Sequence, residues 1–255
     1  MKMQSTIPAP VTSGSLRSAL YTFFTEYPIL SAMLIALAHI LLAIVLGIVA
    51  KALVPQWQPD YVATILMSVA VAGELALLGW WKTVGFNAPS VWRNLRFLLI
   101  PCLVVIGLPF LRGIQTSDWG TFLYLLVGYA LTGFMEEGQM RGVVLHILKP
   151  LGVTKSVVIS SILFALLHAT NFLFRNPWIV LAQMVGAFVH GIGLSALRLR
   201  TNTIWFVVIL HGIHDLFLKY TNFPAIPLDV VQVTLLMLYG IYLLRTWREP
   251  EVVQA

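Results

Sequence analysis

The sequence predicts an all-α protein, a polytopic transmembrane helical bundle with about eight spans. Hydrophobic residues make up 59% of the 255 residues and charged residues only 10%, whereas a soluble domain carries about 25% charged residues. The apolar residues fall into long runs, and runs of roughly 18 or more indicate membrane spans. Because a chain in lipid must satisfy its own backbone hydrogen bonds, we expect these runs to be helices.

Short polar connectors separate the apolar runs. Proline, glycine and asparagine are frequent in these connectors, as expected for loops. The eight expected spans cover residues 29–50, 61–81, 95–111, 119–147, 157–174, 178–197, 203–219 and 230–245. We therefore expect an N-terminal segment 1–28, a transmembrane bundle 29–245 and a C-terminal tail 246–255.

The charge pattern points to a membrane partner. The formal net charge is +6, and most Lys and Arg residues lie between the apolar runs. This distribution is typical of topology signals and lipid-headgroup contacts, so we expect membrane lipid as a partner and no nucleic acid. The single cysteine, Cys102, allows neither an intramolecular disulfide nor a cysteine-based metal site.

Three charged residues interrupt the run 119–147. A charge inside the bilayer costs about 2.5–3.5 kcal/mol on insertion scales, so it is kept for a reason. Glu137 and Arg141 are four residues apart, in the order that favours an intrahelical ion pair. Glu136 has no such local partner and points about 100° away from Glu137, so we expect it to have a separate task as a general base. The alternative is that all three residues form one structural polar cluster.

Histidines occur in two other runs. His168 lies in the run 157–174, and His211 and Asp215 share a helix face in the run 203–219. His214 competes for the same face. A single histidine in an apolar helix is more often a hydrogen-bonded interior residue, whereas a histidine paired with a carboxylate also occurs in catalytic sites and beside metals.

Depth in the membrane connects these residues. If the N-terminus is cytoplasmic, Glu136 lies about 20 Å, His168 about 18 Å and His211 about 12 Å from the cytoplasmic ends of their helices, at 1.5 Å per residue. Packing does not readily explain why three helices present these residue types at a similar level. The pattern therefore favours a catalytic site in the cytoplasmic half of the bundle.

The motifs resemble those of the CPBP family of intramembrane proteases, also called the CAAX-protease and bacteriocin-processing or Abi family. The resemblance covers about residues 119–220, which would form the catalytic core. The matching positions, in the family's order and spacing, are Glu136-Glu137 with Arg141, Phe164 with His168, and His211 with Asp215.

The resemblance implies an intramembrane endopeptidase that hydrolyses membrane-associated or lipidated proteins and peptides. Glu136 and His168 would activate the attacking water, and His211 and Asp215 would stabilise the oxyanion, which are the two needs of peptide hydrolysis. The residues that would support the site structurally are Glu137, Arg141 and Phe164.

The favoured mechanism requires no cofactor and no metal. A zinc ion held by Glu136, His168 and His211 with one open position is the alternative. The sequence also departs from the family at one place: the family usually has bulky apolar residues between its Glu-Glu pair and Arg, and this chain has Gly138-Gln139-Met140.

Two other function classes compete with the protease. The first is a non-proteolytic immunity or regulatory protein that keeps the family fold, which the departure at Gly138-Gln139 makes credible. The second is a transporter that uses the polar residues as an ion path, but the sequence shows no pair of broken helices in two matching halves. Interior packing is the expected role of the remaining intramembrane polar residues, His39, Glu74, His190 and His214.

We predict a multi-pass integral membrane protein, in the bacterial inner membrane, with both termini in the cytoplasm. Alternating loops place twelve Lys and Arg residues on the side of the termini and four on the other side, and cytoplasmic loops carry the excess of basic residues. Reporter fusions at Ala255 and within residues 51–60 should therefore report opposite sides of the membrane. If both reporters lie on the same side, the topology and the depth relationship are wrong.

Overall fold

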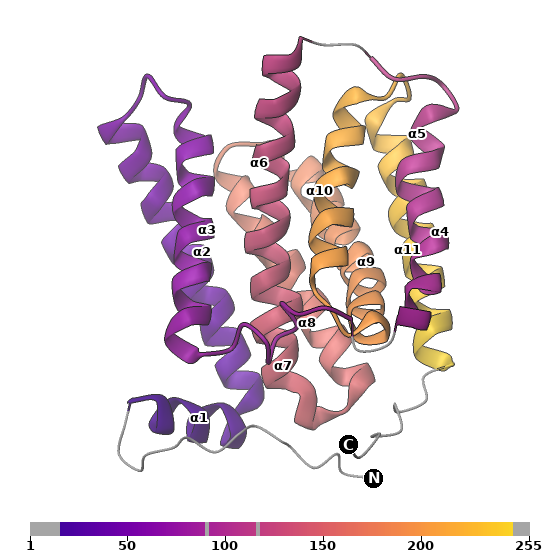
Figure 1. The fold of residues 1–255 in the computed structure, drawn as a ribbon. Coiled ribbons are helices and arrows are strands. Elements are labelled where there is room, and N and C mark those ends of the chain that lie inside the picture. Colours follow the sequence, from indigo (N-terminus) through magenta and orange to yellow (C-terminus); the bar gives the residue numbers. More distant parts are fainter. Residues whose placement is uncertain (1–15, 90–91, 116–117, 247–255) are drawn as a thin grey trace.

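The computed structural model describes residues 16–89, 92–115 and 118–246, and within them the chain forms helices and no named strand (Figure 1). The rest of the expected N-terminal segment and tail lies outside the described residues. The α-helices are α1 Leu16–Glu26, α2 Pro28–Leu53, α3 Pro59–Leu78, α4 Leu99–Cys102, α5 Leu108–Phe110, α6 Trp119–Glu137, α7 Leu145–Leu148, α8 Val153–Leu167, α9 Pro177–Thr201, α10 Trp205–Tyr220 and α11 Ala225–Arg245. The 3-10 or π-helical segments are η1 Trp92–Leu98, η2 Leu103–Gly107, η3 Gly138–Val144, η4 Lys149–Leu151 and η5 His168–Leu173.

The all-α prediction is confirmed, but the count of about eight spans is higher than the structure supports. Each of the eight apolar runs contains helix. In the described part of the chain, five helices are long and apolar enough to cross a membrane: 28–53, 59–78, 153–173, 177–201 and 225–245. The helix over 94–110 is shorter, α10 has 16 residues, and the run 119–148 is divided by the π-helical η3.

Residues 16–26, within the expected N-terminal segment, form the helix α1, which packs against the bundle. Phe24 is 6% exposed and belongs to a cluster with the end of α3. The Tyr21 hydroxyl donates to the carbonyl oxygen of Leu78 at 2.9 Å, and Trp80 Nε1 donates to the Tyr21 hydroxyl at 2.7 Å. These contacts hold α1 beside the end of α3, where Figure 1 shows it across one end of the bundle.

Successive long helices run in alternating directions, so the start of α2 and the end of α11 lie at the same end of the bundle (Figure 1). Local sequence explains where several helices begin. Proline occupies the first turn of α2, α3 and α9, where its missing N–H costs no helical hydrogen bond. The Asp118 side chain accepts a hydrogen bond from the backbone N–H of Thr121 at 2.9 Å and so caps α6.

Glycines set the close crossing of α6 and α10. A Cβ at Gly133 would lie 2.5 Å from the carbonyl oxygen of Val208, and one at Gly212 would lie 2.9 Å from that of Tyr129. The two backbones are therefore in direct contact, as at other membrane-helix interfaces built on small residues. This approach brings the side chains of the α6 C-terminus next to those of the middle of α10.

Glycines also allow a close crossing of α9 and α11, on the other side of the bundle. A Cβ at Gly193 of α9 would lie 2.8 Å from the carbonyl oxygen of Leu236 in α11, and one at Gly240 would lie 2.8 Å from the Cα of Gly193. The helices α9 and α11 thus also meet backbone to backbone.

The substitution Gly133→Ala should destabilise the protein and lower its melting temperature in detergent. The new Cβ collides with a backbone oxygen that cannot move independently, and such overpacking typically costs about 1–3 kcal/mol. The matched control is Gly73→Ala, because nothing lies within 4 Å of a Cβ at Gly73. Equal melting temperatures for the two variants would show that the α6–α10 crossing is not set by Gly133.

Candidate active site

The site begins at the last turn of α6, which carries two adjacent glutamates. Glu137 is the last residue of α6, and η3 follows it directly. All seven residues of η3 are buried, and π-helical turns of this kind are frequent at functional sites. Arg141 lies within η3, and its Nη1 donates to Glu137 Oε1 at 3.0 Å, with both side chains 0% exposed. The ion pair predicted from the spacing is present.

His211 joins this pair from α10. Its Nδ1–H donates to the same Glu137 Oε1 at 2.8 Å, so this single oxygen accepts from both Arg141 and His211. The His211 side chain is 6% exposed. Because charge-assisted hydrogen bonds in a dry interior are strong, Glu137 fixes the orientation of the imidazole and leaves its Nε2 facing away from the ion pair.

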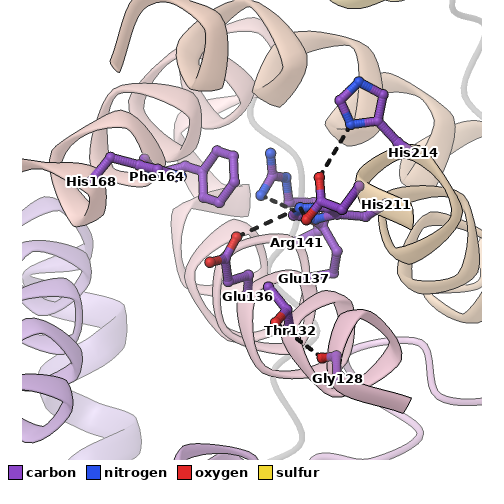
Figure 2. Close-up of polar contacts among 10 residues, drawn as sticks. Gly128, Thr132, Glu136, Glu137, Arg141, Phe164, His168, His211 and His214 are labelled. Carbon is purple, nitrogen blue, oxygen red and sulfur yellow. Dashed lines mark hydrogen bonds and ion pairs between the residues drawn. The ribbon is translucent and has the colours of Figure 1, made fainter. Parts of the chain in front are cut away.

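Glu136 lies on the other edge of the His211 ring. Its Oε2 is 3.7 Å from His211 Nε2, and its side chain is 17% exposed. Glu136 has no partner on its own helix, as expected, but it faces the same histidine as Glu137. An imidazole has nitrogens on two edges, so a ring lying across the end of α6 contacts Glu137 with one nitrogen and Glu136 with the other (Figure 2).

Asp215 completes the α10 side of the site. Its Oδ2 lies 3.6 Å from His211 Nε2, one helical turn away, as the spacing predicts. The other carboxylate oxygen, Oδ1, accepts from His214 Nδ1 at 3.3 Å. At 3.6–3.7 Å neither Asp215 nor Glu136 makes a direct hydrogen bond to His211 Nε2. This nitrogen therefore lies between two carboxylates, both of which have some exposure.

The end of α8 supplies Phe164 and His168. The Arg141 Cζ lies 4.0 Å from the centre of the Phe164 ring, a cation–π contact. The same ring meets the rings of His168 and His211 edge-on, with centroids 5.1 and 6.1 Å away. Phe164 is 2% exposed, so Arg141, His168 and His211 pack around one buried aromatic ring (Figure 2).

His168 is the first residue of η5, where the helix 153–173 changes from α-helical to 3-10 geometry. Its Nδ1–H donates to the carbonyl oxygen of Phe164 at 3.1 Å. A carbonyl only accepts hydrogen bonds, so this contact leaves Nε2 as the nitrogen that can accept a proton. His168 is also near enough to Glu136 for the two groups to interact electrostatically.

Two histidines that the sequence reasoning assigned to packing lie beside the site. The His190 ring of α9 is 5.4 Å from the His211 ring and 4.8 Å from the His214 ring, centroid to centroid. Among the described residues, His190 Nε2 is buried without a hydrogen-bond partner, which agrees with packing. His214 also contacts two carboxylates, on Asp215 and on Asp229 of α11. In the sequence, only the three-residue spacing of His214 from His211 indicates that His214 lies beside the site.

Glu74 and His39 lie elsewhere, in a pocket of about 190 Å³ between α2 and α3 that Gln139 also lines. Gln139 is 2% exposed, and its Nε2 donates to Glu74 Oε1 at 3.5 Å. A Cβ at the adjacent Gly138 would lie 3.3 Å from Val71 Cγ1. The glycine and glutamine that depart from the family pattern are therefore accommodated by this chain's own neighbours on α2 and α3.

The metal alternative involves Glu136, His168 and His211. No group of three or more His, Cys, Asp or Glu side chains in the described residues could hold a metal ion. The Nδ1 atoms of His168 and His211 are both engaged as donors. These two bonds leave Nε2 of each ring as the nitrogen that can hold a ligand, as in metal-binding histidines, and the chelator experiment below distinguishes zinc from the metal-free mechanism.

Comparison with known families supports the resemblance drawn from the motifs. Residues 118–217 match the family model described as type II CAAX prenyl endopeptidase, Rce1-like. This segment resembles that protease family. The match covers less than half of the chain and includes all the proposed catalytic residues, from α6, η5 and α10. In comparisons with curated proteins and with solved structures, nothing matches the chain.

Glu137→Gln and Arg141→Ala should each lower the melting temperature of the purified protein and promote aggregation after detergent extraction. Removing one member of a buried ion pair leaves the other uncompensated, which typically costs about 3–5 kcal/mol. Arg175→Ala is the matched control, because Arg175 is exposed. Wild-type melting behaviour in both site variants would remove their supporting role.

Proposed function

We propose that the protein is an intramembrane endopeptidase that hydrolyses membrane-associated or lipidated protein substrates. The observation that carries this proposal is the convergence of Glu136, His168 and His211 from three separate helices. Glu136 lies 3.7 Å from His211 Nε2, and the match to a prenyl-endopeptidase family covers the same segment.

In the proposed reaction, Glu136 and His168 activate a water molecule. Glu136 takes one proton from the water, and His168 orients the water through its Nε2. The water oxygen forms a bond to the carbonyl carbon of the substrate. The proton then passes to the amide nitrogen as the carbon–nitrogen bond breaks, giving a carboxylic acid and an amine. Groups of this kind typically contribute 10²–10⁴-fold to the rate.

His211 and Asp215 would act on the carbonyl oxygen. Glu137 holds the imidazole by Nδ1 at 2.8 Å, so a proton on Nε2 points to the side where Glu136 also lies. That N–H can donate to the oxyanion as it forms, and Asp215 at 3.6 Å holds the ring toward this position. The chemistry uses no cofactor, and the surrounding lipid and the substrate are the partners it needs.

The proposal includes an integral membrane protein of the bacterial inner membrane with cytoplasmic termini and a catalytic core over residues 119–220. A regulatory or immunity protein with the same fold is the alternative. The departure from the family pattern at Gly138 gives this alternative little support, because neighbouring side chains within 3.5 Å of a Cβ there already fill the space beside that residue. A transporter would be indicated if the wild-type protein conducts ions, the site variants lose this ion flux, and neither cleaves the peptide.

Glu136→Gln should abolish cleavage while leaving the protein folded. The change keeps the shape of the side chain and removes the base, so the rate should fall about 10²–10⁴-fold. His168→Ala and His211→Ala should give losses of similar size. The double variant Glu136→Gln with His168→Ala should be barely worse than either single variant, because groups that act as one unit are not additive. Asp215→Asn should be mild, because the resembled family has either residue at this position.

The assay uses a prenylated CAAX-box peptide in detergent micelles, with the melting temperature of every variant measured in parallel. Labelling of new protein N-termini in membranes that carry the wild-type protein or Glu136→Gln identifies further substrates. Cleavage by Glu136→Gln at the wild-type rate would refute the proposed mechanism. Loss of cleavage in a strong chelator, restored by zinc, would show a metal site and a different mechanism.

A further inference from the structure

A line of alternating histidines and carboxylates extends from the site toward α11. Asp215 uses one oxygen toward His211, at 3.6 Å, and the other toward His214 Nδ1, at 3.3 Å. His214 Nε2 lies 3.2 Å from Asp229 Oδ1. Each nitrogen of the His214 ring therefore faces a different carboxylate, and His214 links Asp229 to Asp215.

Burial changes along this line. The His211 and His214 side chains are 6% and 4% exposed, whereas those of Asp215 and Asp229 are 27% and 38% exposed. The contact between His214 and Asp229 is a charge contact of the protonated ring, because His214 Nε2 makes no aligned hydrogen bond among the described residues. Asp229 thus holds the ring by charge from a helix that contributes no motif to the site.

The placement of Asp229 on α11 is specific. A carboxylate in a membrane helix is costly and is normally retained with a partner, and His214 is that partner. The helix α11 packs backbone to backbone on α9 at Gly193 and Gly240, and its first half contacts α10 through Asp229 and His214. Asp229 lies outside the segment 118–217 that matches the endopeptidase family, so the match gives Asp229 no role in the site.

We propose that Asp229 is a positioning residue for the peptidase reaction and acts on His211 through His214 and Asp215. This inference rests on the proposed function. The Asp215 carboxylate can rotate about its side-chain bonds, and rotation would exchange its contacts with the two histidines. His214, held between Asp215 and Asp229 and packed 4.8 Å from the His190 ring, prevents that rotation. The Asp215 oxygen near His211 Nε2 then stays in place while the oxyanion forms.

The test compares Asp229→Asn with the wild-type protein on the prenylated CAAX-box peptide. The variant keeps the side-chain volume and removes the charge. Carboxylates that orient a functional histidine from outside the site typically contribute about 10–100-fold to activity. Two residues, His214 and Asp215, lie between Asp229 and His211. We therefore expect kcat to fall about tenfold and KM to change by less than about twofold. Asp229→Glu keeps the charge and should restore most of the loss.

The matched control is Asp60→Asn. Asp60 lies in the first turn of α3, is exposed and is not among the acids that contact the histidines. This variant should keep the wild-type kcat. An equal loss of kcat in Asp60→Asn and Asp229→Asn would indicate a general charge effect and overturn the inference.

A double-mutant cycle tests the connection itself. His214→Asn should reduce kcat as much as Asp229→Asn, and the double variant should be no worse than either, because both interrupt the same line. Independent, multiplicative losses would contradict the inference. The cycle also guards against misfolding of a single variant, because folding damage at two sites adds while loss of one shared connection does not.

A spectroscopic measurement separates this inference from the proposed function. In protein labelled with ¹⁵N-histidine, the His214 imidazole signal is the one that disappears in His214→Asn. This signal should shift in Asp229→Asn and keep its position in Asp60→Asn. An unshifted signal overturns the inference whatever the activity. If Glu136→Gln cleaves normally, the proposed function fails. If Glu136→Gln is inactive and Asp229→Asn keeps the wild-type kcat, only the role of Asp229 fails.

Discussion

The site depends on one buried oxygen atom, Glu137 Oε1. It accepts hydrogen bonds from Arg141 within its own helix and from His211 in α10, at 3.0 and 2.8 Å. A carboxylate in lipid is costly to bury unless it is paired and hydrogen-bonded; Oε1 meets both conditions, whereas Glu137 Oε2 is buried without a hydrogen-bond partner among the described residues. Oε1 also joins two helices whose backbones touch at Gly133 and Gly212. The remaining contacts of the site, to Glu136, Asp215 and Phe164, are organised around the histidine that Glu137 holds.

Local features of the site could be predicted from the sequence, because helix geometry fixes them. The Glu137–Arg141 pair and the neighbourhood of His211 and Asp215 follow from a four-residue spacing. Counting residues from the helix ends also predicts a similar depth for Glu136, His168 and His211. Contacts between helices could not be derived in this way. The hydrogen bond between His211 and Glu137 depends on how closely α6 approaches α10, and a one-sequence pattern does not give the rotation of one helix about another.

For the fold, too, some features can be predicted from the local sequence and others cannot. Long apolar runs predict helices reliably, because a chain in lipid has no other way to satisfy its backbone. The pattern does not predict the π-helical stretch at Gly138–Val144 or the start of a 3-10 turn at His168. It also assigns His214 to packing, since nothing in the sequence shows that Asp229, fifteen positions further on, comes back beside it on α11.

The π-helical stretch at Gly138–Val144 limits how the chain can change length. A π-helical turn closes one residue later than an α-helical turn. Returning the stretch to a regular α-helix would therefore rotate everything after it by about 100°, the turn of one residue. Arg141 would stay near Glu137, because a four-residue spacing suits a regular α-helix, but the buried face of α7 would turn away from the core that Ile147 and Leu148 occupy. A single-residue insertion or deletion between Glu137 and Arg141 would break the ion pair and turn α7 together, whereas one after Arg141 would turn α7 alone.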